Sequence, residues 1–370
     1  MTKKILIVDP YYGGSHRHWA DGLRKYSRFT ISVLSLPARH WKWRMHGGAV
    51  TLAEEFNKLK SPPDLILATD MMDVATFIGL IQQTTKVPIP VVTYFHENQL
   101  AYPKSVQDSD LQTSRDDHYG FINYTSALVS DRVIFNSQYN QSTFLNLLKD
   151  MLSRLPDYQN IDTVSHIEQK SVILYPGIDT ELFDSVEITQ KKQDSPLVIW
   201  NHRWEYDKNP EPFFQALESI DLKQIPFQLA VLGDHHKNYP VEFSTAEKNL
   251  QDRIVHFGYL QKQIDYARWL KMGDILPVTS NQDFFGISIV EAIYCGCLPL
   301  LPNRLSYPEL IPSEYHQELI YSENDMFGSK LEQMIINPPK LTKSELKQIG
   351  VRFSWKRMID RYDDLFESIL

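Results

Sequence analysis

Short apolar runs recur along the first half of the chain, and each is followed by a helical stretch. The runs lie at 5–9, 29–36, 64–70, 87–97, 131–137 and 171–177. Strands that alternate with helices in this way indicate βαβ units, which build a parallel sheet with helices on both faces. The pattern therefore predicts a doubly wound α/β domain in this half of the chain.

The same alternation begins again after a polar segment, 182–196, which ends in Ser-Pro as a linker would. A second set of apolar runs lies at 196–202, 227–234, 253–259, 274–280 and 297–302. The length of 370 residues also favours two domains. We therefore expect an N-terminal Rossmann-like domain at 1–181 and a C-terminal one at 197–350, facing each other across a cleft.

The last segment, 351–370, predicts an amphipathic helix because its apolar residues are three and four positions apart. They are Trp355, Met358, Ile359, Tyr362, Leu365 and Phe366. We expect this helix to pack back toward the N-terminal domain.

The composition is that of a globular protein, with 42% hydrophobic and 12% aromatic residues. No apolar run is long enough to span a membrane, and the first one is too short for a signal peptide. The two cysteines, Cys295 and Cys297, give neither a disulfide framework nor a metal site. We therefore expect a cytoplasmic protein with no membrane partner.

The formal net charge of −8 is distributed unevenly. Residues 10–53 contain seven Lys or Arg and one acid, a local balance of +6. Within them, the segment 39–46 combines cations with two tryptophans and has no acid. An acidic protein can still bind an anionic polymer through a local basic surface. We interpret the segment as a basic loop whose partner the charge alone does not identify; solvated cations beside half-buried tryptophans are the alternative to a binding role.

The segment 281–302 combines a loop acid, a glycine and the start of an apolar helix. Gly286 lets the backbone approach a ligand closely, and free N–H groups at the helix start favour a diphosphate. Glu291, just over a turn into the helix, is a costly lone acid unless it is paired. It can meet a protein donor or accept hydrogen bonds from ligand hydroxyl groups, and the residues alone leave both possibilities open.

Three other places carry candidate chemistry. Arg203 and Lys208, five residues apart, could clamp a diphosphate or could be a solvated pair bonded to nearby acids. In the first domain, Gly13 and Gly14 could allow a close approach to a phosphate or an acceptor, or could form a tight turn without a ligand. His96 follows another strand and could bind a ligand or be a satisfied core histidine.

His235 and His236 invite a metal interpretation. Adjacent side chains diverge, and no cluster of acids completes a site. We therefore expect a solvated loop there and no metal.

The spacing from Asp283 to Glu291 resembles the E-x7-E signature of retaining glycosyltransferases of family 4, which have the two-domain GT-B fold. The resemblance implies that Asp283 contacts hydroxyl groups of the donor sugar and that Glu291 binds the nucleotide ribose. It also implies donor contacts at the helix start, at Phe285, Gly286 and Ile287. Asp283 replaces the usual Glu, which shortens the side chain that grips the sugar.

The same resemblance assigns roles to the other candidates. Arg203 and Lys208 would stabilise the departing diphosphate, and His96 would orient the sugar. Gly13 and Gly14 would lie near the donor phosphate. Enzymes of this architecture generally use protein cations in place of a metal, so no cofactor is expected. No side chain in these motifs is an obvious nucleophile, which favours front-face attack with retention.

Six segments resemble, more specifically, the tRNA-queuosine α-mannosyltransferases, from the first strand to about Glu309. They are DPYYGGSHRHW, LPARHWKWRMHGGAVTLAEEF, LATDMMDVATF, YFHENQLAYP, NHRWEYDKNPEPFF and DFFGISIVEAIYCGCLPLLPNRLSYPE. This resemblance implies transfer of mannose from GDP-mannose, a nucleotide sugar, to the cyclopentene diol of queuosine. That base occupies the wobble position of an aspartate tRNA.

Acceptor binding is then expected in the first domain, where the positive charge is concentrated. Cations can meet phosphates, and flat rings can stack on unpaired bases. The residues expected at the acceptor are Arg39, Trp41, Lys42, Trp43 and Arg44, followed by His16, Arg17 and His18, and then Glu97 and Asn98. Two other functions stay open: a glycosyltransferase of this fold acting on a lipid or small glycoside, and a nucleotide-binding protein without catalysis.

Overall fold

The computed structural model of the chain forms two compact units. It describes residues 3–82, 85, 87–103, 117–188, 195–234, 239–322 and 324–370. The first unit comprises Met1–Gly177 and Trp355–Leu370, and the second comprises Ile178–Ser354. His235 and His236, and residues 189–194 of the expected linker, lie outside the described residues.

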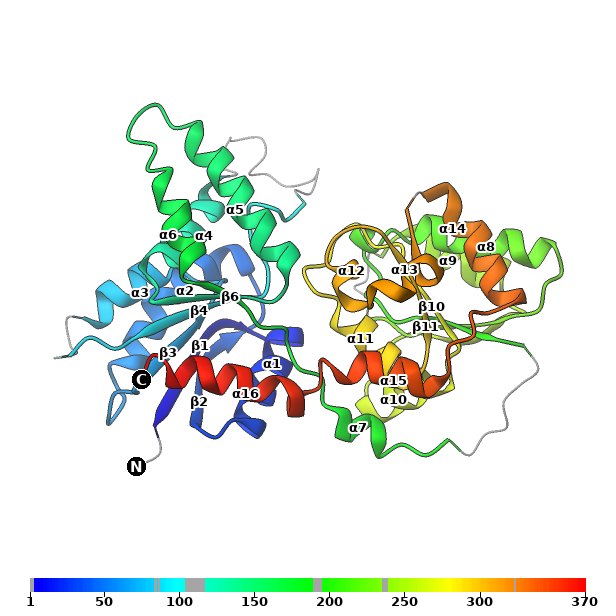
Figure 1. Cartoon of the computed structure of the whole chain (residues 1–370), viewed down its shortest axis with the longest axis horizontal. Coiled ribbons are helices and arrows are strands. Elements are labelled where there is room, and N and C mark those ends of the chain that lie inside the picture. Colours follow the sequence, from blue (N-terminus) through cyan, green and yellow to red (C-terminus); the bar gives the residue numbers. More distant parts are fainter. Residues whose placement is uncertain are drawn as a thin grey trace. The chain divides into compact units, whose positions relative to one another are not determined.

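A six-stranded parallel sheet with the order β2-β1-β3-β4-β5-β6 forms the centre of the first unit (Figure 1). Its strands are β1 (Lys4–Tyr12), β2 (Thr30–Pro37), β3 (Leu65–Thr69), β4 (Val91–Phe95), β5 (Arg132–Phe135) and β6 (Ser171–Ile173). Every residue of β3 and β4 is buried, as expected for central strands with helices on both faces.

Helices pack on both faces of this sheet. They are α1 (Gly14–Tyr26), α2 (Trp41–Phe56), α3 (Val74–Ile81), α4 (Asp117–Val129), α5 (Gln138–Ser153), α6 (Asp162–Gln169) and α16 (Trp355–Glu367). Successive strand residues point to opposite faces. Accordingly, Ile5 and Ile7 join a core with α1 and α16, whereas Leu6 and Val8 join a core with α2 and α3.

Helix α16 completes the core of the first unit although it is the last helix of the chain (Figure 1). The Trp19 indole donates to the Tyr362 hydroxyl at 3.2 Å, and this hydroxyl lies 3.1 Å from the Leu174 carbonyl oxygen. Trp355 lies against α1 so closely that a Cβ on Gly22 would come within 2.1 Å of its indole. Only glycine at position 22 accommodates the indole there.

Replacing Trp355 with alanine is expected to destabilise the first unit by about 3–5 kcal/mol, because it empties the space of a buried indole. Urea unfolding followed by circular dichroism measures the loss. The replacement Trp269→Ala, at a partly buried indole of the second unit, should leave the transition of the first unit unchanged. A change below about 1 kcal/mol in Trp355→Ala would contradict the role given to this contact.

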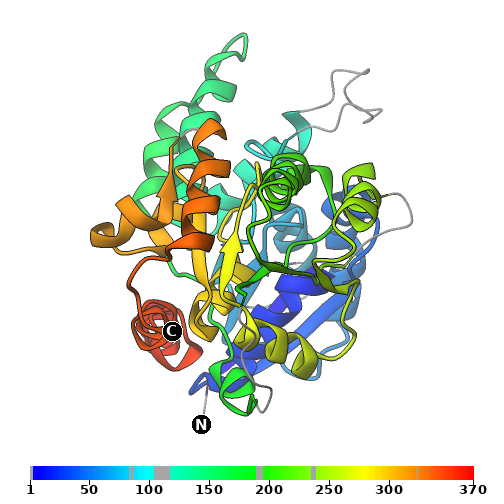
Figure 2. The ribbon, with the colours of Figure 1, turned by 90° about the vertical axis from the view of Figure 1, so that its right-hand side faces the viewer.

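The second unit contains another six-stranded parallel sheet, with the order β12-β11-β10-β7-β8-β9. Its strands are β7 (Leu197–Trp200), β8 (Gln228–Val231), β9 (Ile254–Phe257), β10 (Ile275–Pro277), β11 (Leu298–Pro302) and β12 (Ile320–Tyr321). Its helices are α7 (Thr180–Asp184), α8 (Pro210–Leu222), α9 (Val241–Asn249), α10 (Gln263–Met272), α11 (Ile287–Cys295), α12 (Tyr307–Leu310), α13 (His316–Leu319), α14 (Asn324–Ile336) and α15 (Lys343–Val351). Helices α8, α9 and α14 pack together on one face, and α7, α10, α11 and α15 on the other (Figure 1; Figure 2).

The segment expected as a linker begins inside the second unit. Residues 182–184 end helix α7, whose Asp184 accepts hydrogen bonds from the Tyr294 hydroxyl at 2.9 Å and the Lys347 ammonium at 2.7 Å. These bonds fix α7 to α11 and α15. No helix among the described residues is long and apolar enough to cross a membrane.

The expectation of a basic loop at 39–46 is wrong, because helix α2 begins at Trp41. Its buried residues recur with helical spacing, at Met45, Ala49, Leu52 and Phe56, and they pack under β1 and β3. The cations of the segment therefore belong mostly to the first turn of a helix and not to a loop.

Candidate active site

In the first unit, polar side chains gather where β1, β3 and β4 end. Asp9, in the last part of β1, is fully buried and accepts from the Tyr11 N–H at 2.9 Å and the Thr69 hydroxyl at 3.2 Å. His16, on the first turn of α1, places Nδ1 3.3 Å from both carboxylate oxygens of Asp9. The carboxyl ends of parallel strands are where doubly wound sheets bind ligands, so this cluster is the candidate site of the first unit.

His96 follows β4 and stacks on this pair. Its ring lies 3.8 Å from the His16 ring with an interplanar angle of 25°. Its backbone N–H donates to Asp70 Oδ1 at 2.9 Å, and its carbonyl oxygen accepts from Asn136 at 2.7 Å. His96 Nε2 and Asp70 Oδ2 are both buried, and neither has a hydrogen-bond partner among the described residues. Buried polar atoms are normally paired, so such atoms point to a functional site.

The charges in this cluster follow from burial and from the acids around it. Burial opposes the charge on His16, but Asp9 outweighs it and raises the pKa of His16 to about 9. Burial, and then the charge of His16, lower the pKa of His96 well below its usual value. Burial raises the pKa of Asp70 to about 8, although His16 acts in the opposite direction. At neutral pH the stack therefore joins a charged imidazole to a neutral one.

The two positions after β1 are glycine for different structural reasons. A Cβ on Gly13 would come 2.5 Å from Ala38 Cβ, so contact within the protein explains this glycine. Gly14 has a φ of 50° and opens onto free space at the start of α1. Of the two, Gly14 leaves backbone that a ligand could approach.

Two residues expected at the acceptor are buried. His16 is 6% exposed and is bonded to Asp9. Asn98 is fully buried, and its amide group donates to Asn140 Oδ1 at 2.8 Å and accepts from the Ala101 N–H at 2.8 Å. Both side chains therefore act through contacts inside the unit. Arg17 and His18 are exposed, and Glu97, which is partly buried, accepts from Gln99 at 2.7 Å.

The first turn of α2 carries the basic segment at the surface. His40 precedes it with a φ of 55°, and its side chain makes no capping hydrogen bond. Lys42 and Arg44 follow, although cations are unfavourable near the positive end of a helix dipole. Trp43 is 65% exposed and Arg39 is exposed as well. An anion at this place would relieve the unfavourable charge.

Rings at the start of α4 extend this surface. The Tyr119 ring lies 5.1 Å from the Trp41 ring, and His118 stacks on His46 at 4.7 Å. We call residues 39–46 together with His118 and Tyr119 the basic surface. The α4 residues were missed because their sequence carries no charge run, and only the fold brings them to α2.

In the second unit, Lys208 lies at the centre of a second polar cluster. This side chain is buried, and Nζ lies 2.6 Å from the Gln282 carbonyl oxygen, 3.0 Å from Asp283 Oδ1 and 3.4 Å from Asp207 Oδ2. Asp283 Oδ2 accepts from the Tyr307 hydroxyl at 2.6 Å. Asp283, the first acid of the E-x7-E-like motif, and Lys208, the lysine five residues after Arg203, thus form one ion pair.

Both members of this pair are charged at neutral pH. Burial opposes the charge on Lys208, but Asp283 and Asp207 raise its pKa. Burial likewise opposes ionisation of Asp283, but Lys208 outweighs it and lowers the pKa of this carboxyl. Burial lowers the pKa of the neighbouring His202 to about 4, and its buried Nε2 has no hydrogen-bond partner in the part of the chain that the structure describes. This cluster therefore contains a charged Lys208–Asp283 ion pair beside the neutral imidazole of His202.

Glu291 lies on α11 and meets a protein donor. Its Oε2 accepts from the Tyr266 hydroxyl at 3.0 Å, and the Asn201 amide donates to the same hydroxyl at 3.2 Å. Burial raises the pKa of Glu291 to about 7, and the bond from Tyr266 partly offsets this. Asn201 Oδ1 is buried, and no described residue gives it a hydrogen bond.

Helix α11 begins directly after a glycine. Gly286 precedes the helix with a φ of 88°, and no side chain caps it. Phe285 is buried against Phe353 at a ring distance of 5.5 Å, and Ser306 donates to its carbonyl oxygen at 2.9 Å. Ile287 is the first residue of α11, so its N–H belongs to the free end of the helix. Arg203, more exposed than Lys208, pairs with Glu205 at 3.1 Å.

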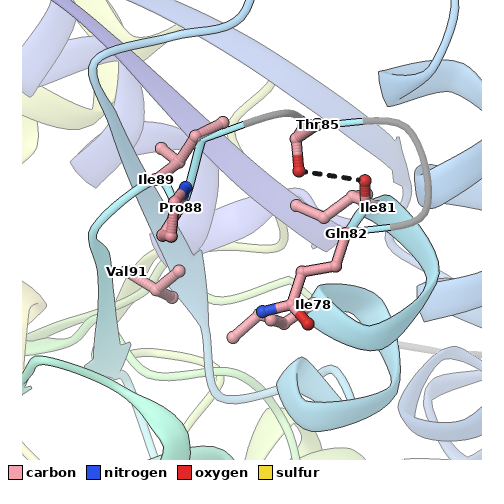
Figure 3. Close-up of a pocket in the computed structure, with 7 residues that line it drawn as sticks. All are labelled: Ile78, Ile81, Gln82, Thr85, Pro88, Ile89 and Val91. Carbon is pink, nitrogen blue, oxygen red and sulfur yellow. Dashed lines mark hydrogen bonds between the residues drawn. The ribbon is translucent and has the colours of Figure 1, made fainter.

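A small cavity of about 30 Å³ in the first unit lies away from this chemistry (Figure 3). It is lined mostly by aliphatic side chains, among them Val91 at the start of β4, and Thr85 donates to the Ile81 carbonyl oxygen at 3.2 Å. Its described lining contains no cationic side chain that could neutralise a phosphate. Within the described parts of the chain, no three His, Cys, Asp or Glu side chains gather closely enough to hold a metal ion.

Comparison with known proteins places this geometry in a family. Residues 4–178 match the family model described as tRNA-queuosine alpha-mannosyltransferase N-terminal, and residues 183–348 match Glycosyl transferases group 1. The tRNA-queuosine alpha-mannosyltransferase of Drosophila melanogaster is 32% identical over 98% of this chain and 96% of its own length. The chain belongs to the tRNA-queuosine α-mannosyltransferase family. The resemblance of its motifs to that family is confirmed.

Solved structures agree on the fold of this family member. HepE from Anabaena, solved in complex with UDP, has a TM-score of 0.70 at 17% identity and covers 99% of this chain and 100% of its own. Sucrose-phosphate synthase from Thermosynechococcus elongatus has a TM-score of 0.72 at 14% identity, with 100% and 99% covered. The predicted α/β class, with two Rossmann-like domains of the GT-B type, is confirmed.

Proposed function

We propose that this chain transfers mannose from GDP-mannose to the cyclopentene diol of queuosine in the anticodon of an aspartate tRNA, with retention at the anomeric carbon. The observation that carries the proposal is the family membership, which spans almost the whole chain. The paired charges of the second unit and the basic surface of the first support it, because they suit a nucleotide sugar and a tRNA respectively.

The second unit binds the donor in this proposal. Glu291 accepts hydrogen bonds from the ribose, and Asp283 accepts them from mannose hydroxyl groups. Arg203, Lys208 and the free N–H groups at the start of α11 bind the diphosphate. Lys208 Nζ already contacts three oxygen atoms. A bound diphosphate therefore replaces part of the contact between Lys208 and a carboxylate. The exposed Arg203 can turn toward the ligand without breaking a buried pair.

The reaction breaks the bond between the anomeric carbon and the diphosphate oxygen. A hydroxyl oxygen of the diol forms the new bond on the same face of the sugar, and its proton passes to the departing diphosphate. Negative charge develops on that diphosphate, and cations fixed in place stabilise it without reorganising. His96, neutral at the pH of the reaction, orients a substrate hydroxyl group through Nε2. No metal is required in this scheme.

The first unit binds the acceptor. Arg39, Lys42 and Arg44 meet tRNA phosphates, and the rings of Trp41, Trp43 and Tyr119 offer faces for unpaired bases. His18 and Arg17 on α1, and Glu97 after β4, are further candidates. An anticodon loop presents both phosphates and unstacked bases, and this combination of cations and rings suits it.

Incorporation of labelled mannose into purified tRNA tests the proposal. We expect GDP-mannose to label the tRNA, and UDP-glucose neither to label it nor to compete at equal concentration. Labelling from UDP-glucose, or labelling of a lipid extract in place of tRNA, would overturn the donor or the acceptor assignment respectively.

The ionisation of Glu291 makes donor binding depend on pH. Its carboxylate form, which ribose hydroxyl groups need as an acceptor, is lost as the pH falls through about 7. We expect GDP to bind about tenfold more weakly at pH 6 than at pH 8, and Glu291→Gln to remove this difference. Calorimetric titration of both proteins measures it. Parallel pH dependence in the two proteins would show that Glu291 does not bind the nucleotide.

A further inference from the structure

The pair of Asp9 and His16 is built firmly into the first unit. Asp9 accepts hydrogen bonds from the His16 ring, the Tyr11 N–H and the Thr69 hydroxyl. Each partner comes from a different element, namely α1, the end of β1 and the end of β3. A buried carboxylate held in this way fixes the imidazole that it binds.

Three rings enclose His96 in turn. His16 stacks on one face at 3.8 Å, while Trp19 and Tyr94 approach at 4.9 Å and 4.7 Å with nearly perpendicular or steeply inclined planes. Trp19 and Tyr94 are themselves stacked at 4.2 Å. The backbone of His96 is also bonded on both sides, and the three surrounding rings limit the orientation of its imidazole.

The charge of His16 has a consequence for His96. Two stacked imidazoles 3.8 Å apart cannot both be positively charged imidazolium ions without strong repulsion. Since Asp9 supplies the counter-charge to His16 directly, the excess proton stays on His16. The titratable groups that face His16 are Asp9 and Tyr11 on β1, Asp70 after β3, and His96 and Glu97 after β4.

We propose that Asp9 and His16 are positioning residues for sugar transfer: they hold His96 in one ring plane and in its neutral form, so that Nε2 meets a substrate hydroxyl group. The proposal rests on the function proposed above, and gives His16 a role other than contact with tRNA. His96 alone would touch the substrate, and Asp9 would act only through His16.

The Asp9–His16 pair also sets an upper pH limit for activity. The pKa of His16 is raised from 6.5 to about 9, so the stabilisation from the ion pair is complete below pH 6.5 and is lost as the pH rises through about 9. Above that pH Asp9 stays buried without its cation. We expect kcat to fall on the alkaline side near pH 9, and to fall on the acidic side only where His96 becomes protonated.

The test uses His16→Phe, which keeps a flat ring but removes the charge, and Asp9→Asn, which removes the counter-charge. We expect kcat to fall about 10- to 100-fold in each, with the donor KM nearly unchanged because the proposed donor site lies in the second unit. In His16→Phe we expect the acidic limb of the kcat profile to move to higher pH, since His96 loses its charged neighbour. His166→Phe, an exposed histidine on α6, serves as the control and should behave as the unmodified chain.

Imidazole NMR titration of the unmodified chain provides a measurement that needs no activity. We expect the His16 signals to show a protonated ring at pH 8 and the His96 signals a neutral ring at pH 6. A neutral His16 at pH 7, or a kcat profile of His16→Phe identical to that of the control, would overturn the proposal. If Asp9→Asn does not fold, the kcat profile of His16→Phe and the NMR titration still test the proposal. Absence of transfer by the unmodified chain would instead refute the proposed function and leave the titration result standing.

Discussion

Replacing Lys208 with methionine is expected to lower kcat for mannose transfer by about 10²- to 10³-fold, because the departing diphosphate loses a buried cation. The same change leaves Asp283 without its ion-pair partner, while the Tyr307 hydroxyl remains bonded to it. We therefore also expect a loss of stability of about 3 kcal/mol in the second unit. Initial rates at saturating donor and urea unfolding measure the two effects separately.

A second variant distinguishes the two effects of Lys208. In Lys208→Met/Asp283→Asn one of the two buried carboxylates that lose Lys208 is removed and Asp207 remains, so stability should recover in part while activity should not. Lys223→Met, at an exposed lysine of the same unit bonded to Glu332, is the matched control and should retain full activity. Recovery of activity in the double variant would mean that Lys208 acts only as the partner of Asp283.

Replacing Lys42 and Arg44 together with alanine is expected to weaken tRNA binding by about tenfold for each phosphate that the surface no longer binds, the equivalent of about 1.4 kcal/mol each. The slope of log affinity against log salt should become shallower by about one for each of these phosphates. The first turn of α2 contains no acid, so the replacement lowers the positive charge of this turn without exposing a carboxylate within it. Filter binding over a range of salt concentrations measures both quantities.

The helix itself supplies the control for this experiment. Lys58, just beyond the end of α2, is exposed and bonded to Glu55 at 2.6 Å. Its replacement by alanine removes a positive charge from the same unit but leaves the basic surface intact, so affinity and salt slope should not change. If Lys58→Ala and the double variant lost equal affinity for tRNA, the loss would reflect net charge in general and not the basic surface.

Much of the architecture could be predicted from the chain because its strands are buried on both faces. Such strands appear as uninterrupted apolar runs, and β3 and β4 are of this kind. Helix α16 was predicted from the regular spacing of Trp355, Tyr362 and Phe366, which lie on its buried face. Helix α2 was misjudged because its charges received more weight than the helical spacing of its buried residues.

The candidate site was predicted less completely. Asp9 and Asp70 were missed, although each is the first acid after a buried apolar run, which is a usable signal. Tyr307 and Tyr266 gave no signal, because they lie 24 and 25 positions from the acids that they bond. Local spacing cannot show pairings of that kind, since they depend on how the helices fold onto the sheet.

Nucleoside mass spectrometry after incubation with GDP-mannose tests the central claim most directly. Two preparations of the same aspartate tRNA are compared, one containing queuosine and the other guanosine at the wobble position. The account predicts one added hexose on queuosine in the first preparation and no modified nucleoside in the second. Unmodified queuosine after complete incubation, or hexose addition to both preparations, would contradict it.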